Sequence, residues 1–195
     1  MKSLANNLLP YDGEAYLYKG LFQEQNLLEQ IKQEVKWRND KIKMFGKTYQ
    51  QARKVAWEGD EGIKYCYSNI LMQAVGWSPS VMSLKQEIET FLERPDYFNS
   101  ALVNLYRTGT DHMSWHSDNE KELGVKPLIA SLSFGATRDF FFRHQKGHKV
   151  KIELSCGDLL IMQGQTQEFW KHSLPKRLKV HTERLNITFR KIQQF

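Results

Sequence analysis

The segment from Arg184 to Arg190 alternates strictly between polar and apolar residues. Because successive side chains of a β-strand point to opposite faces, this pattern predicts a strand with one polar and one apolar face. The polar face carries Arg184, Asn186, Thr188 and Arg190. Such a face can point to solvent or line a ligand cavity, and this segment alone supports both interpretations equally.

The same period of two recurs after about residue 100, where the pattern predicts a series of strands. We expect them at 101–106, 128–134, 138–143, 149–154, 158–162 and 184–190. Glycine or proline separates these segments, and many short strands of this kind indicate a double-sheet barrel. Earlier in the chain, apolar residues at helical spacing predict helices over Leu27–Val35 and Val81–Leu92, both flanking a sheet.

The bulk properties are those of one compact unit. The chain has 195 residues, 41% of them hydrophobic, and no repeats or linker-like segment, so we expect a single domain over residues 1–195 that acts as a monomer.

Cys66 and Cys156 form no CxxC pair, which favours a reducing, intracellular location in the cytoplasm or nucleus. No signal-peptide core or membrane-length apolar run is present, so no membrane partner is expected. The formal net charge of +6 permits a polyanionic partner without requiring one.

A second strand carries isolated hydrogen-bonding groups on one face. Within 101–106, Asn104 and Tyr106 share a face with Leu102, whereas the opposite face is wholly apolar. The guanidinium groups of the last strand can each bind one carboxylate in a bidentate manner, and an amide and a phenol add further hydrogen bonds. Together these groups favour a cavity that holds a small dicarboxylate.

A metal site is indicated by His116 and Asp118, with His172 downstream. On an extended segment, the i, i+2 spacing places the imidazole and the carboxylate on the same side, and the second histidine completes a two-histidine, one-carboxylate triad. The His-x-Asp pattern is weak by itself, since such tripeptides occur by chance. A triad of this kind leaves three coordination positions open, enough for a bidentate 2-oxo acid and dioxygen.

The other histidines have simpler interpretations. His144 and His148 have the i, i+4 spacing of a helical metal site, but they flank Gly147 between two predicted strands. A solvated hairpin therefore fits them better. His112 and His181 have no acidic partner in a comparable arrangement and are interpreted as surface residues.

Taken together, the Asn104 and Tyr106 strand, the His116 and Asp118 pair, His172 and the polar final strand resemble the AlkB family of oxidative dealkylases. The segments 131–140 and 172–175 are similar to the branch that repairs duplex DNA, and the likeness covers roughly residues 10–192. This resemblance implies an α+β, mainly β fold. Its core would be a double-stranded β-helix (jelly-roll) over 100–192, with flanking N-terminal helices and a nucleotide-recognition lid over 42–69.

The resemblance also implies the cofactor site. His116, Asp118 and His172 would hold Fe(II), with O2 and the co-substrate 2-oxoglutarate bound beside it. Arg184 would pair with the distal carboxylate of 2-oxoglutarate and Arg190 with the carboxylate near the metal. The residues assisting them would be Asn104, Tyr106, Asn186 and Thr188.

Nucleic-acid contacts follow from the same resemblance. A finger at Phe45, Gly46 and Lys47 would wedge into duplex DNA and fill the gap left by a flipped base. An aromatic ring from Tyr65, Cys66 and Tyr67 would stack on that base, which lies against His116 on its other side. The remaining substrate contacts would be Arg53, the base-edge residues Asn119 and Glu120, and the basic-loop residues Arg177 and Lys179.

The function implied is oxidative demethylation of 1-methyladenine and 3-methylcytosine in double-stranded DNA, which is a direct-reversal repair. The products would be formaldehyde, succinate, CO2 and the restored base. One alternative is the same chemistry on RNA or single-stranded DNA. Another, of a different class, is a non-catalytic jelly-roll that binds nucleic acid, because a fold does not fix a function. For Phe45, Tyr65 and Tyr67, an ordinary place in a sheet or core is also open.

Overall fold

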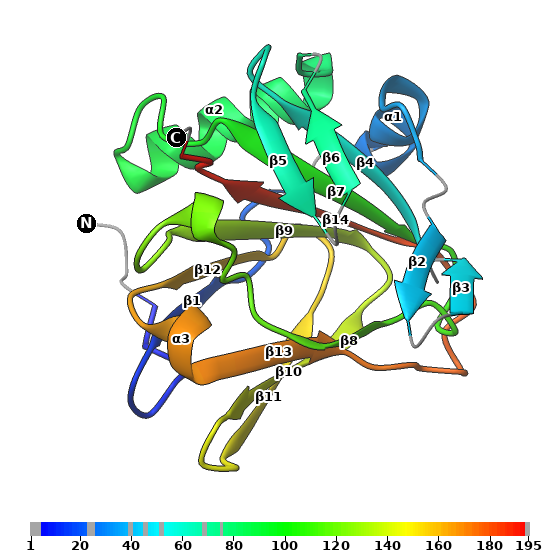
Figure 1. Ribbon diagram of the computed structural model, residues 1–195. Helices are drawn as coiled ribbons and strands as arrows, with labels where there is room; N and C mark the ends of the chain where they lie inside the picture. Colours follow the sequence, from blue (N-terminus) through cyan, green and yellow to red (C-terminus); the bar gives the residue numbers. More distant parts are fainter. Residues whose placement is uncertain are drawn as a thin grey trace.

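Two antiparallel sheets form the centre of the protein (Figure 1). The structure is a computed structural model, and it describes residues 5–22, 26–38, 41–44, 47–50, 53–67, 70–74 and 76–193. The larger sheet has six strands in the order β1 (Glu14–Tyr18), β12 (Leu159–Gln163), β9 (Ile129–Gly135), β14 (Arg184–Arg190), β7 (Ser100–Tyr106) and β4 (Lys54–Gly59). The smaller sheet has four, in the order β11 (Lys149–Leu154), β10 (Arg138–His144), β13 (Trp170–Leu174) and β8 (Met113–His116).

From β7 onward the chain passes repeatedly between the two sheets. The strands β7, β9, β12 and β14 belong to the larger sheet, and β8, β10, β11 and β13 belong to the smaller one. Each sheet therefore contains strands that are distant in sequence, which is the arrangement of a double-stranded β-helix, or jelly-roll. The predicted fold class and all six predicted strands are confirmed, with ends that shift by a residue or less.

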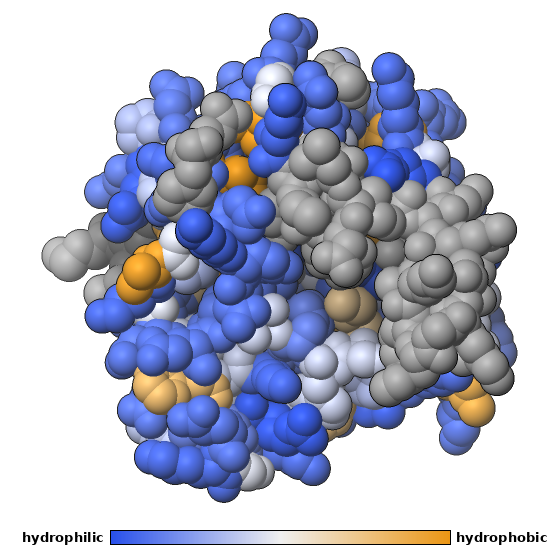
Figure 2. Space-filling model, in the orientation of Figure 1, coloured by the Kyte–Doolittle hydropathy of each residue, from blue (hydrophilic) through white to orange (hydrophobic). Residues whose placement is uncertain are grey.

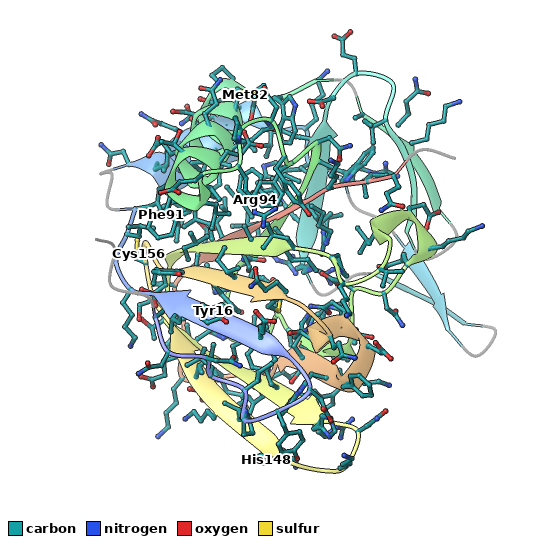
Figure 3. The ribbon with its side chains drawn as sticks, turned by 90° about the vertical axis from the view of Figure 1, so that its left-hand side faces the viewer. Tyr16, Met82, Phe91, Arg94, His148 and Cys156 are labelled. Carbon is teal, nitrogen blue, oxygen red and sulfur yellow. The ribbon has the colours of Figure 1, made fainter. Side chains whose placement is uncertain are left out.

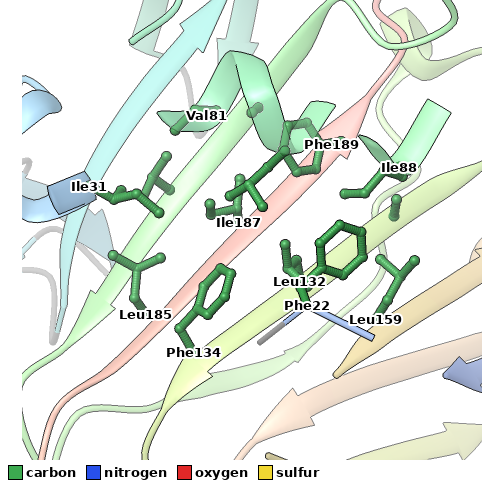
Figure 4. Packing of buried hydrophobic residues seen from close by; sticks show 14 of the residues in the cluster. Phe22, Ile31, Val81, Ile88, Leu132, Phe134, Leu159, Leu185, Ile187 and Phe189 are labelled. Carbon is green, nitrogen blue, oxygen red and sulfur yellow. The ribbon is translucent and has the colours of Figure 1, made fainter. Parts of the chain in front are cut away.

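Two helices cover the outer face of the larger sheet: α1 (Leu27–Glu34) and α2 (Pro79–Leu92). Figure 4 shows Ile31 of α1 and Val81 and Ile88 of α2 against apolar side chains of β14 and β9. Each of these three side chains is completely buried, and burial of one aliphatic side chain contributes about 1.5–3 kcal/mol. Pro79 at the first position begins α2, and Glu93, in a left-handed conformation with φ of 56°, ends it. Both predicted helices are thus confirmed.

The strand β14 has two different buried faces. Its apolar residues Leu185, Ile187 and Phe189 point to the helices and are fully buried there. Its polar residues point the other way, between the two sheets, where each is less than a tenth exposed. The sequence left open whether this polar face meets solvent or a cavity, and the structure shows that it is enclosed.

Several elements were not among the predicted strands. The strands β1 and β4 come from outside residues 100–192 and extend the larger sheet on both sides. Two small hairpins, β2 (Lys41–Met44) with β3 (Lys47–Gln50) and β5 (Lys64–Tyr67) with β6 (Ile70–Gln73), overlap the range 42–69 where a lid was expected. The strand β4 lies in the same range but belongs to the larger sheet. The short helices η1 (Lys121–Leu123) and α3 (Thr166–Phe169) complete the described elements. No helix in the described ranges is both long and apolar enough to cross a membrane. On the face drawn in Figure 2, most of the described residues are hydrophilic, and the apolar ones form only small, separate spots.

The β10–β11 hairpin projects at the opposite end of the molecule from α2, as Figure 3 shows from the positions of His148 and Phe91. The hairpin predicted here is confirmed, but the prediction that it is solvated is wrong for His144, which is only 1% exposed. The N-terminal segment covers this ring: Tyr11 meets it edge-on, and the Asp12 carboxylate lies 3.4 Å from its Nε2. Trp170 fixes the position of this N-terminal segment by donating a hydrogen bond from Nε1 to the Tyr11 carbonyl.

Candidate functional site

A cavity lies between the two sheets, and polar side chains from both sheets line it. The larger sheet contributes Leu102, Asn104, Tyr106, Ser131, Met162, Arg184, Asn186, Thr188 and Arg190. Arg53, directly before β4, lies on the same side as the larger sheet, and the smaller sheet and the segment after β8 contribute Met113, His116, Asp118, Phe140, His172 and Leu174. Every residue that the resemblance assigns to iron or 2-oxoglutarate therefore lines this one cavity.

Three ligand-type side chains converge in this cavity. Their nearest donor atoms, one each from His116, Asp118 and His172, all lie within 4.8 Å of one another. His116 and His172 are paired across the adjacent strands β8 and β13, and their ring centroids are 4.2 Å apart. One metal ion can contact all three groups at this separation, as the facial triad requires.

The hydrogen bond of His116 fixes which ring nitrogen faces the other ligands. Its Nδ1 lies 2.9 Å from the Ser114 carbonyl oxygen, which can only accept, so Nδ1 is the donor. The lone pair is then on Nε2, which lies 3.7 Å from Oδ1 of Asp118. A backbone carbonyl that orients a histidine in this way is a common feature of metal sites.

Burial keeps the His172 side chain in the neutral form that a metal ligand requires. Burial lowers its pKa to about 3, and the nearby His116 ring acts in the same direction, so the imidazole is uncharged at neutral pH. Its Nδ1 is buried without a hydrogen-bond partner among the described residues, and an unsatisfied buried nitrogen costs free energy unless another group meets it. The Phe140 ring stacks on the imidazole at a centroid distance of 5.5 Å and limits its rotation.

Asp118 is held as a carboxylate in the same cavity. Burial alone would raise its pKa, but the Arg190 guanidinium and the two histidine side chains together outweigh this effect and hold the pKa well below its usual range. The Asp118 backbone N–H donates to Gln167 Oε1 at 2.9 Å, which fixes the position of the segment after β8. These three side chains offer two imidazoles and one carboxylate, a donor set that fits Fe(II).

Arg184 is a buried cation at the other end of the cavity. It is 2% exposed, and burial lowers its pKa to about 10. Its Nη2 donates to Ser133 Oγ at 2.9 Å, but no carboxylate in the described part of the chain pairs with it, and its Nε has no partner there. A buried charge is costly when it is unpaired, so the site is complementary to an anion that enters the cavity.

Polar groups near Arg184 and Arg190 form a network of hydrogen bonds. Asn104 accepts from Arg53 Nε at 2.7 Å, and Asn186 donates to Ser131 Oγ at 2.8 Å. Thr188 Oγ1 donates to Asn186 Oδ1 at 3.1 Å. Sequence reasoning did not identify Ser131, because one serine in an apolar strand has no distinctive local signal.

The residues assigned to nucleic acid are placed unevenly. Phe45 and Gly46 lie outside the described residues, and Lys47 is placed only as backbone in β3, as are Tyr65, Cys66 and Tyr67 in β5. Asn119 is exposed, whereas Glu120 is partly buried and has one carboxylate oxygen, Oε2, without a partner among the described residues. Arg177 forms an ion pair with Asp139, and Lys179 is exposed.

Comparison with known proteins was consistent with this geometry. A family model described as the 2OG-Fe(II) oxygenase superfamily matches residues 14–190. The human alpha-ketoglutarate-dependent dioxygenase alkB homolog 3 is 43% identical over 177 residues, which cover 85% of this chain and 60% of that protein. The human DNA oxidative demethylase ALKBH2 is 38% identical over 161 residues, covering 78% of this chain and 61% of that protein.

This chain therefore spans about three fifths of the length of these two relatives. Among solved structures, OsALKBH1 matches with a TM-score of 0.60 and 18% identity, over 91% of this chain and 96% of that one. At this level of identity the similarity concerns the fold alone.

Proposed function

This chain belongs to the 2OG-Fe(II) oxygenase superfamily, and from that premise we propose that it removes methyl groups from N-alkylated nucleobases in DNA. The substrates proposed are 1-methyladenine and 3-methylcytosine. The observation that carries the proposal is one cavity that joins the His116, Asp118 and His172 cluster to buried Arg184, which has no carboxylate partner among the described residues. The names of the two human relatives, a dioxygenase and a DNA oxidative demethylase, support the substrate class.

Each side chain has a defined task in this proposal. His116, Asp118 and His172 hold Fe(II), and Arg184 with Ser133 binds the distal carboxylate of 2-oxoglutarate. Bound Fe(II), with 2-oxoglutarate and O2, would supply the chemistry that oxidises an N-methyl carbon, so that the methyl group is lost as formaldehyde and succinate and CO2 are released. The apolar side chains of Leu102, Met113 and Leu174 line the same cavity. Arg190 pairs with the Asp118 carboxylate and, in this proposal, also binds the carboxylate of 2-oxoglutarate nearest the metal.

The test is formaldehyde release from methylated oligonucleotides by the full chain supplied with Fe(II) and 2-oxoglutarate. We expect formaldehyde and succinate in equal amounts from wild type, and no formaldehyde from His172→Ala. The matched control is His181→Ala, because His181 is exposed on the loop before β14. Equal formaldehyde release by wild type and His172→Ala, or none by wild type on any methylated oligonucleotide, would refute the proposal.

The finer predictions concern the form of the substrate. We propose duplex DNA as the preferred form, because the sequence around Phe45 resembles a wedge that replaces a flipped base. The same chemistry on RNA or single-stranded DNA is the alternative. Phe45→Ala should lower activity on a duplex far more than on the matching single strand, and equal activity on both forms with and without Phe45 would reject the duplex proposal. A monomeric state and a cytoplasmic or nuclear location stay predictions.

A further inference from the structure

A second buried arginine, Arg138, lies next to the end of the cavity that Arg184 occupies. It is the first residue of β10, and only 1% of its surface is exposed. Arg184 lines the cavity, whereas Arg138 does not. Any effect of Arg138 on a bound ligand must therefore act over a distance or through a neighbouring residue.

The two guanidinium groups share one aromatic neighbour. The Arg184 Cζ lies 5.3 Å from the centre of the Tyr106 ring, and the Arg138 Cζ lies 5.9 Å from the same point. Tyr106 and Arg184 are direct partners across β7 and β14, which fixes their relative position. The face of an aromatic ring attracts a cation, so Tyr106 makes it less unfavourable to place two positive charges this close together.

Backbone carbonyls satisfy most of the N–H groups of Arg138. Its Nη2 donates to the Asp111 carbonyl at 2.9 Å and to the Pro175 carbonyl at 2.7 Å. Its Nη1 donates to the Thr108 carbonyl at 3.4 Å, and its Nε is buried with no partner in the described part of the chain. Carbonyl oxygens accept hydrogen bonds but carry no formal charge, so the positive charge of Arg138 is not neutralised by them.

The carboxylate of Asp111, which attracts Arg138 electrostatically, is paired with another arginine. Its Oδ2 accepts from Arg107 Nε at 2.9 Å, and its Oδ1 accepts from Arg107 Nη2 at 3.1 Å. This ion pair is neutral as a unit, so it adds no net negative charge to offset Arg138 and Arg184. A buried cation without a counter-charge is costly, and a second cation nearby adds to that cost.

The two arginines also act on each other. Burial lowers the pKa of Arg184 to about 10, and the charge of Arg138 acts in the same direction. Burial likewise lowers the pKa of Arg138. Both directions reflect surroundings that disfavour positive charge, and an anion that enters the cavity would relieve this effect.

We propose that Arg138 is a specificity residue for the co-substrate, whose charge acts with that of Arg184 to favour a 2-oxo acid that carries a second, distal carboxylate. The attraction between charges that do not touch is much stronger in a buried site than in water, so Arg138 can favour the dianion without contact. This inference rests on the part of the proposed function in which Arg184 binds the distal carboxylate of 2-oxoglutarate. It deepens that part by assigning a share of the selectivity to a residue outside the cavity lining.

The test compares the binding of two acids to the full chain loaded with Ni(II), in the absence of nucleic acid. 2-Oxoglutarate has two carboxylates, whereas 2-oxopentanoate has a methyl group in place of the distal one. Calorimetric titration gives the ratio of the Kd for 2-oxopentanoate to the Kd for 2-oxoglutarate. We expect Arg138→Met to lower this ratio about three- to tenfold, because only 2-oxoglutarate places a charge at the end of the cavity near Arg138.

Further variants separate the charge of Arg138 from its contacts with the carbonyls. Arg138→Lys keeps the charge and should keep most of the selectivity. Arg138→Gln keeps hydrogen-bond donors without the charge, so it should lower the ratio as Arg138→Met does, and it replaces that variant if Arg138→Met fails to fold. The matched control is Arg143→Met on the same strand, because the Arg143 Cζ lies 4.4 Å from the centre of the Trp115 ring and its side chain does not line the cavity. This control should leave the ratio unchanged.

A ratio that falls in Arg138→Gln but not in Arg138→Lys supports the inference. A ratio that stays at the wild-type value in Arg138→Gln, or that falls as far in Arg138→Lys, overturns it, because either result separates selectivity from charge. If wild type binds both acids equally, the assignment of Arg184 to the distal carboxylate fails and the inference fails with it. Failure of the proposed demethylation would appear instead as a lack of formaldehyde release, which these binding measurements do not use.

Discussion

Arg190 donates two hydrogen bonds to the same carboxylate oxygen of Asp118, from Nη2 at 2.7 Å and from Nε at 3.1 Å. Both side chains are less than a tenth exposed. The pair joins the polar face of β14 to the segment that follows β8, so it links this strand to Asp118, one of the three candidate metal ligands. Removal of one partner from a buried pair costs more than the pair contributes, because it leaves an uncompensated charge.

Arg190→Gln should therefore lower the free energy of unfolding of the metal-free protein by about 3–5 kcal/mol. A divalent metal that binds Asp118 should offset part of this loss, so the added metal should stabilise the variant more than wild type. Urea unfolding with and without the metal measures both effects. Arg94→Gln, at an exposed position on the loop after α2, is the control and should change stability by less than about 0.5 kcal/mol.

Acid should weaken the same pair in a defined direction. The folded-state pKa of Asp118 lies well below its value in the unfolded chain, which is about 3.9. The stabilisation is thus fully present above the unfolded pKa and is lost as the pH falls toward the folded one. The difference in unfolding free energy between wild type and Arg190→Gln should shrink between pH 6 and about pH 3. A difference that stays constant or grows on acidification would contradict this account.

Arg184→Met should separate the binding of 2-oxoglutarate from stability. Without the co-substrate, the variant should be at least as stable as wild type, because it removes a buried cation that has no carboxylate partner among the described residues. Its affinity for 2-oxoglutarate should fall about 10- to 100-fold, since a hydrogen bond to a charged group contributes about 1.5–3 kcal/mol. Thermal unfolding with increasing 2-oxoglutarate measures both quantities. A full shift of the Tm in the variant would show that Arg184 does not bind the diacid.

Gly109→Ala should release the turn at residues 177–180. The added Cβ collides with the Arg177 carbonyl, so one of the two loops must move, at a cost of about 1–3 kcal/mol. Trypsin should then cleave faster at Lys176 and Lys179, because both are exposed and the turn has lost the backbone hydrogen bonds that Gly109 makes to Arg177 and Val180. Gly147→Ala is the control, because nothing lies within 4 Å of its added Cβ and the strain at its φ of 93° is confined to the β10–β11 hairpin. It should leave cleavage at the turn unchanged.

Much of the fold and the site could be predicted from local patterns. Strand alternation identifies which side chains share a face, so the grouping of Asn104 with Tyr106, and of Arg184 with Arg190, follows from the order of residues alone. The i, i+2 spacing of His116 and Asp118 places two ligands together for the same reason. These predictions succeed because the geometry of an extended backbone depends only on neighbouring residues.

The identity of the enclosed face was decided by tertiary structure. The polar face of β14 lines a cavity because two helices cover its apolar face and a second sheet covers the polar one. Long-range packing also buries His144 beneath the N-terminal segment and commits Arg177 to Asp139. None of these contacts has a local signal, since each joins residues far apart in the chain. The order of residues determined which groups act together, and the packing of the sheets decided which of them meet a ligand instead of water.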